Sequence, residues 1–318
     1  MNPLRHPNHL DQKGQSGIVM NALSQARVVI VTGGAGGLGS AYVHAFADAG
    51  VRVVVNDVSL DRAQALVDEV VARGGDAVAS DDDVADWDAA GRMVDAALER
   101  WGRLDTIVNN AGVTADRVPV NLEPDQWDIV QAVHLRGTYC LTRRAATHWR
   151  AEHKAGRPVA GRVVNTTSGA GLFGNIGQTN YASAKAGVAS FTLVAAAELA
   201  RYGVTVNAIS PAARTPMSDG LLPERGDGAF DPFDPENVAP VVVWLGSERS
   251  AEVSGQILYV GGGKVTVMEG WSFGPSRDVG RRWSIDELDD VLPVIVAERR
   301  PAEPVIGTSG AQVGQSIR

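Results

Sequence analysis

The chain of 318 residues lacks several features that mark whole classes of protein. Its single cysteine, Cys140, excludes an internal disulfide and fits a reducing compartment. No uncharged apolar run reaches the roughly 18 residues that a membrane span needs. Positive charge is not in excess, since 29 Lys and Arg residues are outnumbered by 37 Asp and Glu residues. We therefore expect a cytoplasmic protein that has neither a nucleic acid nor a membrane as partner.

Short β-branched runs alternate with helical patterns through most of the chain. Strands are predicted at 28–32, 51–56, 77–80, 104–109, 162–166, 204–210 and 257–260, and helices at 39–49, 61–73, 86–101, 124–151 and 180–202. Strands that alternate with helices imply crossover connections and a parallel sheet covered on both faces. The sequence predicts an α/β fold, a single doubly wound Rossmann-type domain at 27–265. Residues 1–26 are predicted to be a flexible tail, and 266–318 a C-terminal extension and tail.

A glycine-rich turn joins the first predicted strand to the helix after it. This segment reads Thr32-Gly33-Gly34-Ala35-Gly36-Gly37-Leu38-Gly39. Glycines allow the backbone to approach a pyrophosphate, and the positive end of a helix stabilises that anion. A flexible turn without a ligand is the competing interpretation, but the strand before it and the helix after it favour a dinucleotide site. Gly33, Gly36, Gly37, Leu38 and Gly39 are its candidate cofactor contacts.

An acidic residue directly follows the second predicted strand and bears on the choice between NAD and NADP. Asp57 follows a run of valines, and a carboxylate there can accept hydrogen bonds from the ribose diol of NAD. It would repel the extra phosphate of NADP, and neither Ala35 nor Gly36 is a Lys or Arg that could receive that phosphate. We predict NAD as the cofactor, with a solvated turn aspartate as the alternative. Asn110, Ala111 and Gly112 close the fourth predicted strand at the same edge of the sheet.

Tyr181 and Lys185 are spaced four residues apart in a predicted helix, so they share one helical face. A tyrosine titrates near ~10, and moving its pKa to roughly 7 takes about 4 kcal/mol. One unit charge about 4 Å away supplies energy of that order at an effective dielectric of ~20. We therefore predict that Lys185 lowers the pKa of the phenol and makes it a proton donor and acceptor near neutral pH. Ser168 precedes this pair.

These motifs, in this order, resemble those of the short-chain dehydrogenase/reductase family. The matching patterns are T-G-x-x-x-G-x-G at 32–39, N-N-A-G at 109–112, a serine at 168 and Y-x-x-x-K at 181–185. The likeness covers about Arg27 to Val265. The segments 133–137, 174–181 and 238–245 are similar to the hydroxyacyl-CoA dehydrogenase part of peroxisomal multifunctional enzyme type 2. They also resemble actinobacterial hydroxyacyl-CoA and steroid-side-chain dehydrogenases.

The resemblance implies roles for individual residues. Tyr181 would exchange a proton with the substrate oxygen, and Ser168 would hold that oxygen. Lys185 would contact the nicotinamide ribose as well as the phenol. Asp83 and Val84 would line the adenine, although a surface loop is the competing interpretation for Asp83.

The chain departs from the family pattern at two places. His134 stands where the family usually has an asparagine that supports a water beside the lysine. It is a candidate for catalytic support, with simple packing as the alternative. Pro211-Ala212 replaces a usual proline-glycine, and Pro211 and Thr215 remain candidate contacts of the cofactor. No histidine spacing suggests a metal, and we expect the acidic run 81–83 to be a solvated turn.

The resemblance implies an oxidoreductase that transfers a hydride between NAD(H) and a secondary alcohol or ketone. A 3-hydroxyacyl or 3-oxoacyl thioester is the expected substrate class. A steroid or another secondary alcohol is the alternative within the family, and a non-catalytic NAD-binding regulator is the alternative outside it. Family members are usually homodimers or homotetramers, so we expect a homo-oligomer. The unpatterned stretch 218–235 is expected to form a lid.

Overall fold

The computed structural model describes residues 27–215, 228, 230–270 and 272–300. The expected N-terminal tail, most of the expected lid and the last 18 residues of the chain lie outside the described residues. The division into a tail, a domain and an extension therefore stays a prediction. Among the described residues, no helix combines the length and the apolar character that crossing a membrane requires. The cytoplasmic location also stays a prediction.

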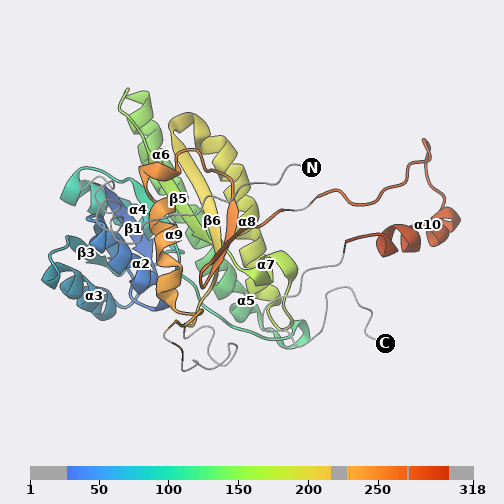
Figure 1. Cartoon of the computed structure of the whole chain (residues 1–318), viewed down its shortest axis with the longest axis horizontal. Helices are drawn as coiled ribbons and strands as arrows, with labels where there is room; N and C mark the ends of the chain where they lie inside the picture. Colours follow the sequence, from blue (N-terminus) through green and yellow to red (C-terminus); the bar gives the residue numbers. More distant parts are fainter. Residues whose placement is uncertain (1–26, 216–227, 229, 271, 301–318) are drawn as a thin grey trace, which may run out of the picture.

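One sheet organises the described part of the chain (Figure 1). Its strands are β1 (Val28–Thr32), β2 (Arg52–Asn56), β3 (Ala77–Ser80), β4 (Thr106–Asn109), β5 (Gly161–Thr166), β6 (Val204–Ala212), β7 (Ile257–Gly261) and β8 (Lys264–Val267). Their order across the sheet is β3-β2-β1-β4-β5-β6-β7-β8, and all neighbours are parallel except β7 and β8. The strand order reverses between β1 and β4, where folds of this type bind ligands at the carboxyl ends of the strands. The predicted α/β doubly wound fold is confirmed.

Helices cover both faces of the sheet because its central strands are apolar on both sides. The residues of β1 read Val-Val-Ile-Val-Thr, and successive side chains point to opposite faces. Val29 and Val31 pack in a core beneath α2 (Gly37–Asp48), α3 (Leu60–Ala72) and α9 (Ala239–Leu245). Val28 and Ile30 pack in a second core beneath α4 (Trp87–Trp101), α6 (Gly137–Lys154) and α8 (Thr179–Leu199).

The long helix predicted for 124–151 is interrupted by a wider turn. It consists of α5 (Pro124–Gln131), a π-helical turn, η2 (Ala132–Arg136), and then α6. The hydrophobic periodicity of the sequence did not indicate this turn. A single π turn rotates the apolar face of the residues after it but does not break the helix. Such turns often occur at functional sites, and this one contains His134.

The C-terminal part differs most from the sequence-based prediction. Strand β8 was not predicted; it pairs antiparallel with β7 through a tight turn and carries the sheet past residue 265. Helix α10 (Ile285–Ala297) begins with a capping box between Ser284 and Glu287. Helix α10 has no buried residue and stands apart from the sheet (Figure 1). Short elements complete the fold: α7 (Gly169–Phe173), η1 (Pro119–Asn121), η3 (Ala200–Tyr202), η5 (Pro235–Asn237) and η6 (Glu248–Ser250).

Candidate active site

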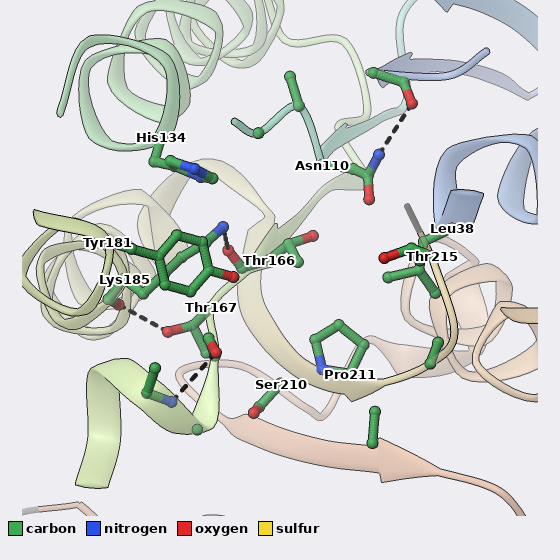
Figure 2. A pocket seen from close by; sticks show the side chains of 18 of the residues that line it. Leu38, Asn110, His134, Thr166, Thr167, Tyr181, Lys185, Ser210, Pro211 and Thr215 are labelled. Carbon is green, nitrogen blue, oxygen red and sulfur yellow. Dashed lines mark hydrogen bonds between the residues drawn. The ribbon is translucent and has the colours of Figure 1, made fainter. Parts of the chain in front are cut away.

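A pocket with a volume of about 1190 Å³ lies at the carboxyl edge of the parallel strands. Its lining comes from the segments that follow β1, β2, β3, β4, β5 and β6, together with α8 and the region around β8. Figure 2 shows His134, Tyr181 and Lys185 on one side of the pocket and Leu38 and Thr215 on the opposite side. The volume exceeds that of a typical small-molecule site, which reaches about 1,000 Å³. It is large enough for a dinucleotide and part of a second molecule.

The glycine turn after β1 forms one wall of this pocket. Gly33 and Gly37 adopt positive φ angles of 59° and 50°, which a residue with a side chain rarely adopts. A Cβ at Gly39 would collide with the carbonyl oxygen of Gly33, so α2 can pack closely behind the turn only without one. Helix α2 begins at Gly37, and its N-cap, Gly36, supplies no side chain to the first backbone N–H groups. These donors and the missing side chains fit the pyrophosphate of a dinucleotide.

Asn110 connects the end of β4 to this turn. Its Nδ2 donates to the carbonyl oxygens of Thr32 at 2.9 Å and Gly33 at 3.2 Å. In return, the Thr32 hydroxyl accepts from the backbone N–H groups of Asn110 and Ala111. A Cβ at Gly33 would lie 2.8 Å from the Cα of Ala111, so the two segments are in close backbone contact. The N-N-A-G segment therefore ties two adjacent strand ends together.

Asp57 and the Asp83–Val84 pair, which follow β2 and β3, also line this pocket. Asp57 is 9% exposed, and its Oδ1 accepts a hydrogen bond from Ser59 N at 3.1 Å. Val84 is buried, whereas the Asp83 carboxylate caps the backbone N–H of Ala85. One acidic and one apolar wall suit a ribose diol and a flat aromatic base.

Tyr181 and Lys185 lie one turn apart at the start of α8, and both face the pocket. The Lys185 Nζ lies 5.6 Å from the centroid of the Tyr181 ring and donates to the carbonyl oxygen of Thr166 at 2.6 Å. Ser168 caps α7 by accepting from Ala170 N at 3.2 Å, and its hydroxyl also interacts with the phenol of Tyr181. The three side chains therefore meet at one point of the pocket wall.

The predicted direction of the Tyr181 pKa shift is wrong for this structure. Burial raises the pKa of Tyr181, and the hydrogen bond from Ser168 opposes that shift only in part. Burial also lowers the pKa of Lys185 to about 7, so the ammonium, not the phenol, titrates near neutrality. An effective dielectric of ~20 suits a pair at the surface, but Lys185 is only 3% exposed and Tyr181 is half-buried. Desolvation then disfavours the charged form of each.

His134 is 2% exposed and sits on the pocket wall beside this pair. Its Nε2 lies 2.7 Å from the carbonyl oxygen of Val113 and 3.1 Å from the N–H of the same residue. Among the described residues, Nδ1 is buried without a partner. Burial and, to a lesser extent, the charge of Lys185 lower the pKa of His134 to about 3. The imidazole is therefore neutral near pH 7, although an ordinary histidine titrates near neutrality.

The structure gathers nearly all of the candidate residues in one pocket. Sixteen of them line it: Gly33, Gly36, Gly37, Leu38, Asp57, Asp83, Val84, Asn110, Ala111, Gly112, His134, Ser168, Tyr181, Lys185, Pro211 and Thr215. Gly39 does not, because it packs behind the turn against Gly33. In the described part of the chain, no group of His, Cys, Asp or Glu side chains is arranged to hold a metal ion.

Sequence reasoning missed other residues of the lining. Arg62 lines the pocket from α3, and Thr266 and Met268 line it at and just after β8. Arg62 occurs in the first turn of the helix that follows the acid, which is the one signal that could have identified it. Thr266 and Met268 carried no signal, because β8 itself was not predicted.

Fold and pocket together define an α/β enzyme built to bind a dinucleotide at the switch point of a parallel sheet. The chain belongs to the short-chain dehydrogenase family, whose model, described as "short chain dehydrogenase", matches residues 27–225. It is therefore an oxidoreductase that uses a nicotinamide dinucleotide and acts on a small-molecule substrate.

Two curated relatives and one solved structure illustrate the likeness. Hydroxyacyl-CoA dehydrogenase ChsB1 of Mycobacterium tuberculosis is 43% identical, over 89% of this chain and 92% of the relative. Peroxisomal multifunctional enzyme type 2 of Mus musculus is 39% identical, over 74% of this chain and 32% of the relative. The crystal structure of a short chain dehydrogenase from Mycobacterium avium has a TM-score of 0.83 and 50% identity, over 89% of this chain and 99% of that one. The predicted family resemblance is confirmed.

Proposed function

We propose that this enzyme is an NAD-dependent dehydrogenase and reductase of 3-hydroxyacyl and 3-oxoacyl thioesters. The proposal rests on one observation. Ser168, Tyr181 and Lys185 lie in the same pocket that the glycine turn lines. When bound, the nicotinamide ring supplies or accepts the hydride. The residues of this chain supply the binding site, the orientation of the substrate and the movement of the proton.

Tyr181 is the group that we assign to proton transfer. Its raised pKa keeps the phenol protonated at neutral pH, so it can donate to a substrate carbonyl oxygen during reduction. Ser168 holds the same oxygen by a second hydrogen bond. Lys185, with a pKa of about 7, is close enough to the ring to stabilise a phenolate when the proton leaves.

The glycine turn and the segments that follow β2, β3 and β6 are assigned to the dinucleotide. The N–H groups at the start of α2 bind the pyrophosphate, and Asp57 accepts hydrogen bonds from the ribose diol. Val84 and Asp83 border the adenine, while Pro211 and Thr215 border the nicotinamide half. We propose a preference for NAD because the Asp57 carboxylate repels a 2′-phosphate. Comparable turnover with NADPH at equal concentration would contradict this preference.

The acyl thioester class is supported by what the relatives are called and by the size of the pocket. The name of ChsB1 describes a hydroxyacyl-CoA dehydrogenase. Besides the residues assigned to the dinucleotide, α7 and the segment that follows β8 line the pocket, and Phe173 and Met268 there are apolar. A steroid or another secondary alcohol would use the same catalytic groups. We also propose a homodimer or homotetramer, as is common in this family.

A panel assay tests the proposal. The protein is mixed with NAD and 3-hydroxyacyl-CoA thioesters, steroid alcohols or simple secondary alcohols, and formation of reduced nicotinamide is followed by absorbance. The largest kcat/KM is expected for a 3-hydroxyacyl thioester. Preference for a steroid alcohol would overturn the assigned substrate class. If no compound in the panel is turned over while NAD still binds, a non-catalytic NAD-binding regulator is favoured.

A further inference from the structure

The side chain of Arg62 lies at the dinucleotide end of the pocket and has no role in the function proposed above. Arg62 is the third residue of α3, one turn beyond the N-cap Ser59. Its Nη2 donates to the carbonyl oxygen of Ala35 at 2.9 Å, so the guanidinium reaches from α3 to the glycine turn. It lines the same pocket as Asp57 and Gly36.

The contact with the glycine turn depends on the missing side chain of Gly36. A Cβ at Gly36 would collide with Nη2 of Arg62. The guanidinium therefore occupies the space beside the turn that a larger residue would take. Neither Ala35 nor Gly36 is itself basic, which favours NAD over NADP. In the structure, however, the guanidinium of Arg62 on α3 lies beside Ala35 and Gly36 and supplies a positive charge there.

The charge of Arg62 is available to a ligand. Among the residues that the structure describes, Arg62 makes no ion pair with a carboxylate, and its one hydrogen bond uses one of five N–H donors. The side chain is exposed and lines the pocket, so a ligand in the pocket can reach its remaining donors. A planar guanidinium with free donors matches the geometry of a phosphate group.

From this placement we infer that Arg62 is a second determinant of cofactor choice, opposed to Asp57. The inference rests on the proposed dinucleotide function. Asp57 disfavours a phosphate on the adenosine ribose, whereas Arg62 attracts one to the same end of the pocket. The preference between NAD and NADP then depends on both the Asp57 carboxylate and the Arg62 guanidinium. Removing the carboxylate shifts the preference toward NADP. Arg62 is thus a latent phosphate-binding group of this chain.

Binding measurements without substrate test the inference. Dissociation constants for NADH and NADPH are measured by calorimetry for wild type and for Asp57→Asn, with and without Arg62→Gln. Asn keeps an oxygen that can accept from Ser59 N, so the first turn of α3 retains its contact. Should Asp57→Asn fail to fold, Asp57→Ser replaces it, and thermal unfolding reports on both. Arg73→Gln is the matched control, because Arg73 ends the same helix and pairs with Asp48 outside this pocket.

The expected results distinguish the effect of the Asp57 carboxylate from that of the Arg62 guanidinium. Asp57→Asn should bind NADPH at least about tenfold more tightly than wild type, because the carboxylate that repels the 2′-phosphate is gone and Arg62 remains. Adding Arg62→Gln should remove about tenfold of NADPH affinity and change NADH affinity by less than about threefold. Adding Arg73→Gln should change neither. An equal loss of both dinucleotides on Arg62→Gln would show that Arg62 only holds the turn, and would overturn the inference. Failure of wild type to bind either dinucleotide would instead overturn the proposed function.

Discussion

The imidazole ring of His134 stands edge-on to the phenol ring of Tyr181, with the ring centroids 5.1 Å apart and an interplanar angle of 89°. The same imidazole contacts the backbone of Val113 and fills the space beside Gly112, where a Cβ would lie 2.5 Å from its Cε1. One buried ring therefore joins the π-helical turn, the segment after β4 and the start of α8. The position of Tyr181 depends on packing as well as on its own helix.

The buried state of His134 predicts a dependence of stability on pH. Its pKa is about 3 in the folded protein against an ordinary 6.5, so the unfolded chain binds more protons between these values. The free energy of unfolding therefore falls as the pH drops from about 6.5, by up to about 1.4 kcal/mol per unit. His134→Asn removes this contribution. Urea unfolding at pH 7, 6 and 5 should show wild type losing stability relative to the variant.

The pH profile of activity provides a second check on His134. Because the imidazole stays neutral, His134→Asn should change the height of the kcat/KM profile between pH 5 and 8 but not its shape. An inflection near pH 6 that disappears in the variant would show that His134 titrates in the working enzyme. That result would contradict the neutral assignment.

Tyr181→Phe should remove the proton donor while leaving the pocket intact. We expect kcat to fall by about 10²–10⁴, the usual contribution of a positioned acid or base. NADH affinity should stay within about threefold of wild type, because the aromatic ring and Lys185 remain. Steady-state kinetics and calorimetry measure the two quantities. Tyr139→Phe, on the exposed face of α6, is the matched control and should behave as wild type. Near-normal turnover in Tyr181→Phe would refute the assigned role.

Gly39→Ala should damage the glycine turn even though Gly39 does not line the pocket. The added methyl group meets the carbonyl oxygen of Gly33, which is backbone and cannot rotate away. We expect a loss of about 1–3 kcal/mol of unfolding free energy, together with weaker dinucleotide binding. Gly263→Ala is the control, since a Cβ at that position meets no atom within 4 Å. Unchanged stability and affinity in Gly39→Ala would mean that α2 can move away from the turn.

Features encoded within a few consecutive residues could be predicted from the sequence. The strand β1, the glycine turn and the one-turn spacing of Tyr181 and Lys185 are of this kind, because local pattern alone defines them. Most of the sheet followed as well, since apolar strands that alternate with helices leave few alternatives to a doubly wound fold. The family resemblance added Ser168 and the residues after β6.

Features that depend on how distant segments meet could not be predicted. The contact of Arg62 with the glycine turn joins two elements, and no spacing in the sequence encodes it. Strand β8 is short and all its residues are exposed, so it lacks the apolar pattern that marked the other strands. The direction of the Tyr181 pKa shift depends on burial, which the tertiary packing sets. His134 is buried by the π turn, which leaves no trace in hydrophobic periodicity.

The buried ammonium of Lys185 predicts a second pH dependence, at the alkaline side. Its pKa is about 7 in the folded protein against an ordinary 10.5, so the unfolded chain binds more protons between these values. The folded state therefore bears the full penalty of a buried charge below pH 7, and stability rises as the pH increases toward 10.5. Lys185→Met removes this dependence. It also leaves the Thr166 carbonyl without its donor, a loss that does not vary with pH.

The measurement that isolates Lys185 is the difference in unfolding free energy between Lys185→Met and wild type. That difference should favour the variant most at or below pH 7 and should shrink by on the order of 1.4 kcal/mol per pH unit up to about pH 10. Other ionisable groups are common to both proteins, so they cancel in the difference. Urea titrations followed by tryptophan fluorescence at pH 7, 8 and 9 provide the values. A difference that stays constant over this range would mean that Lys185 remains charged in the fold, because a group with equal pKa in both states adds no slope.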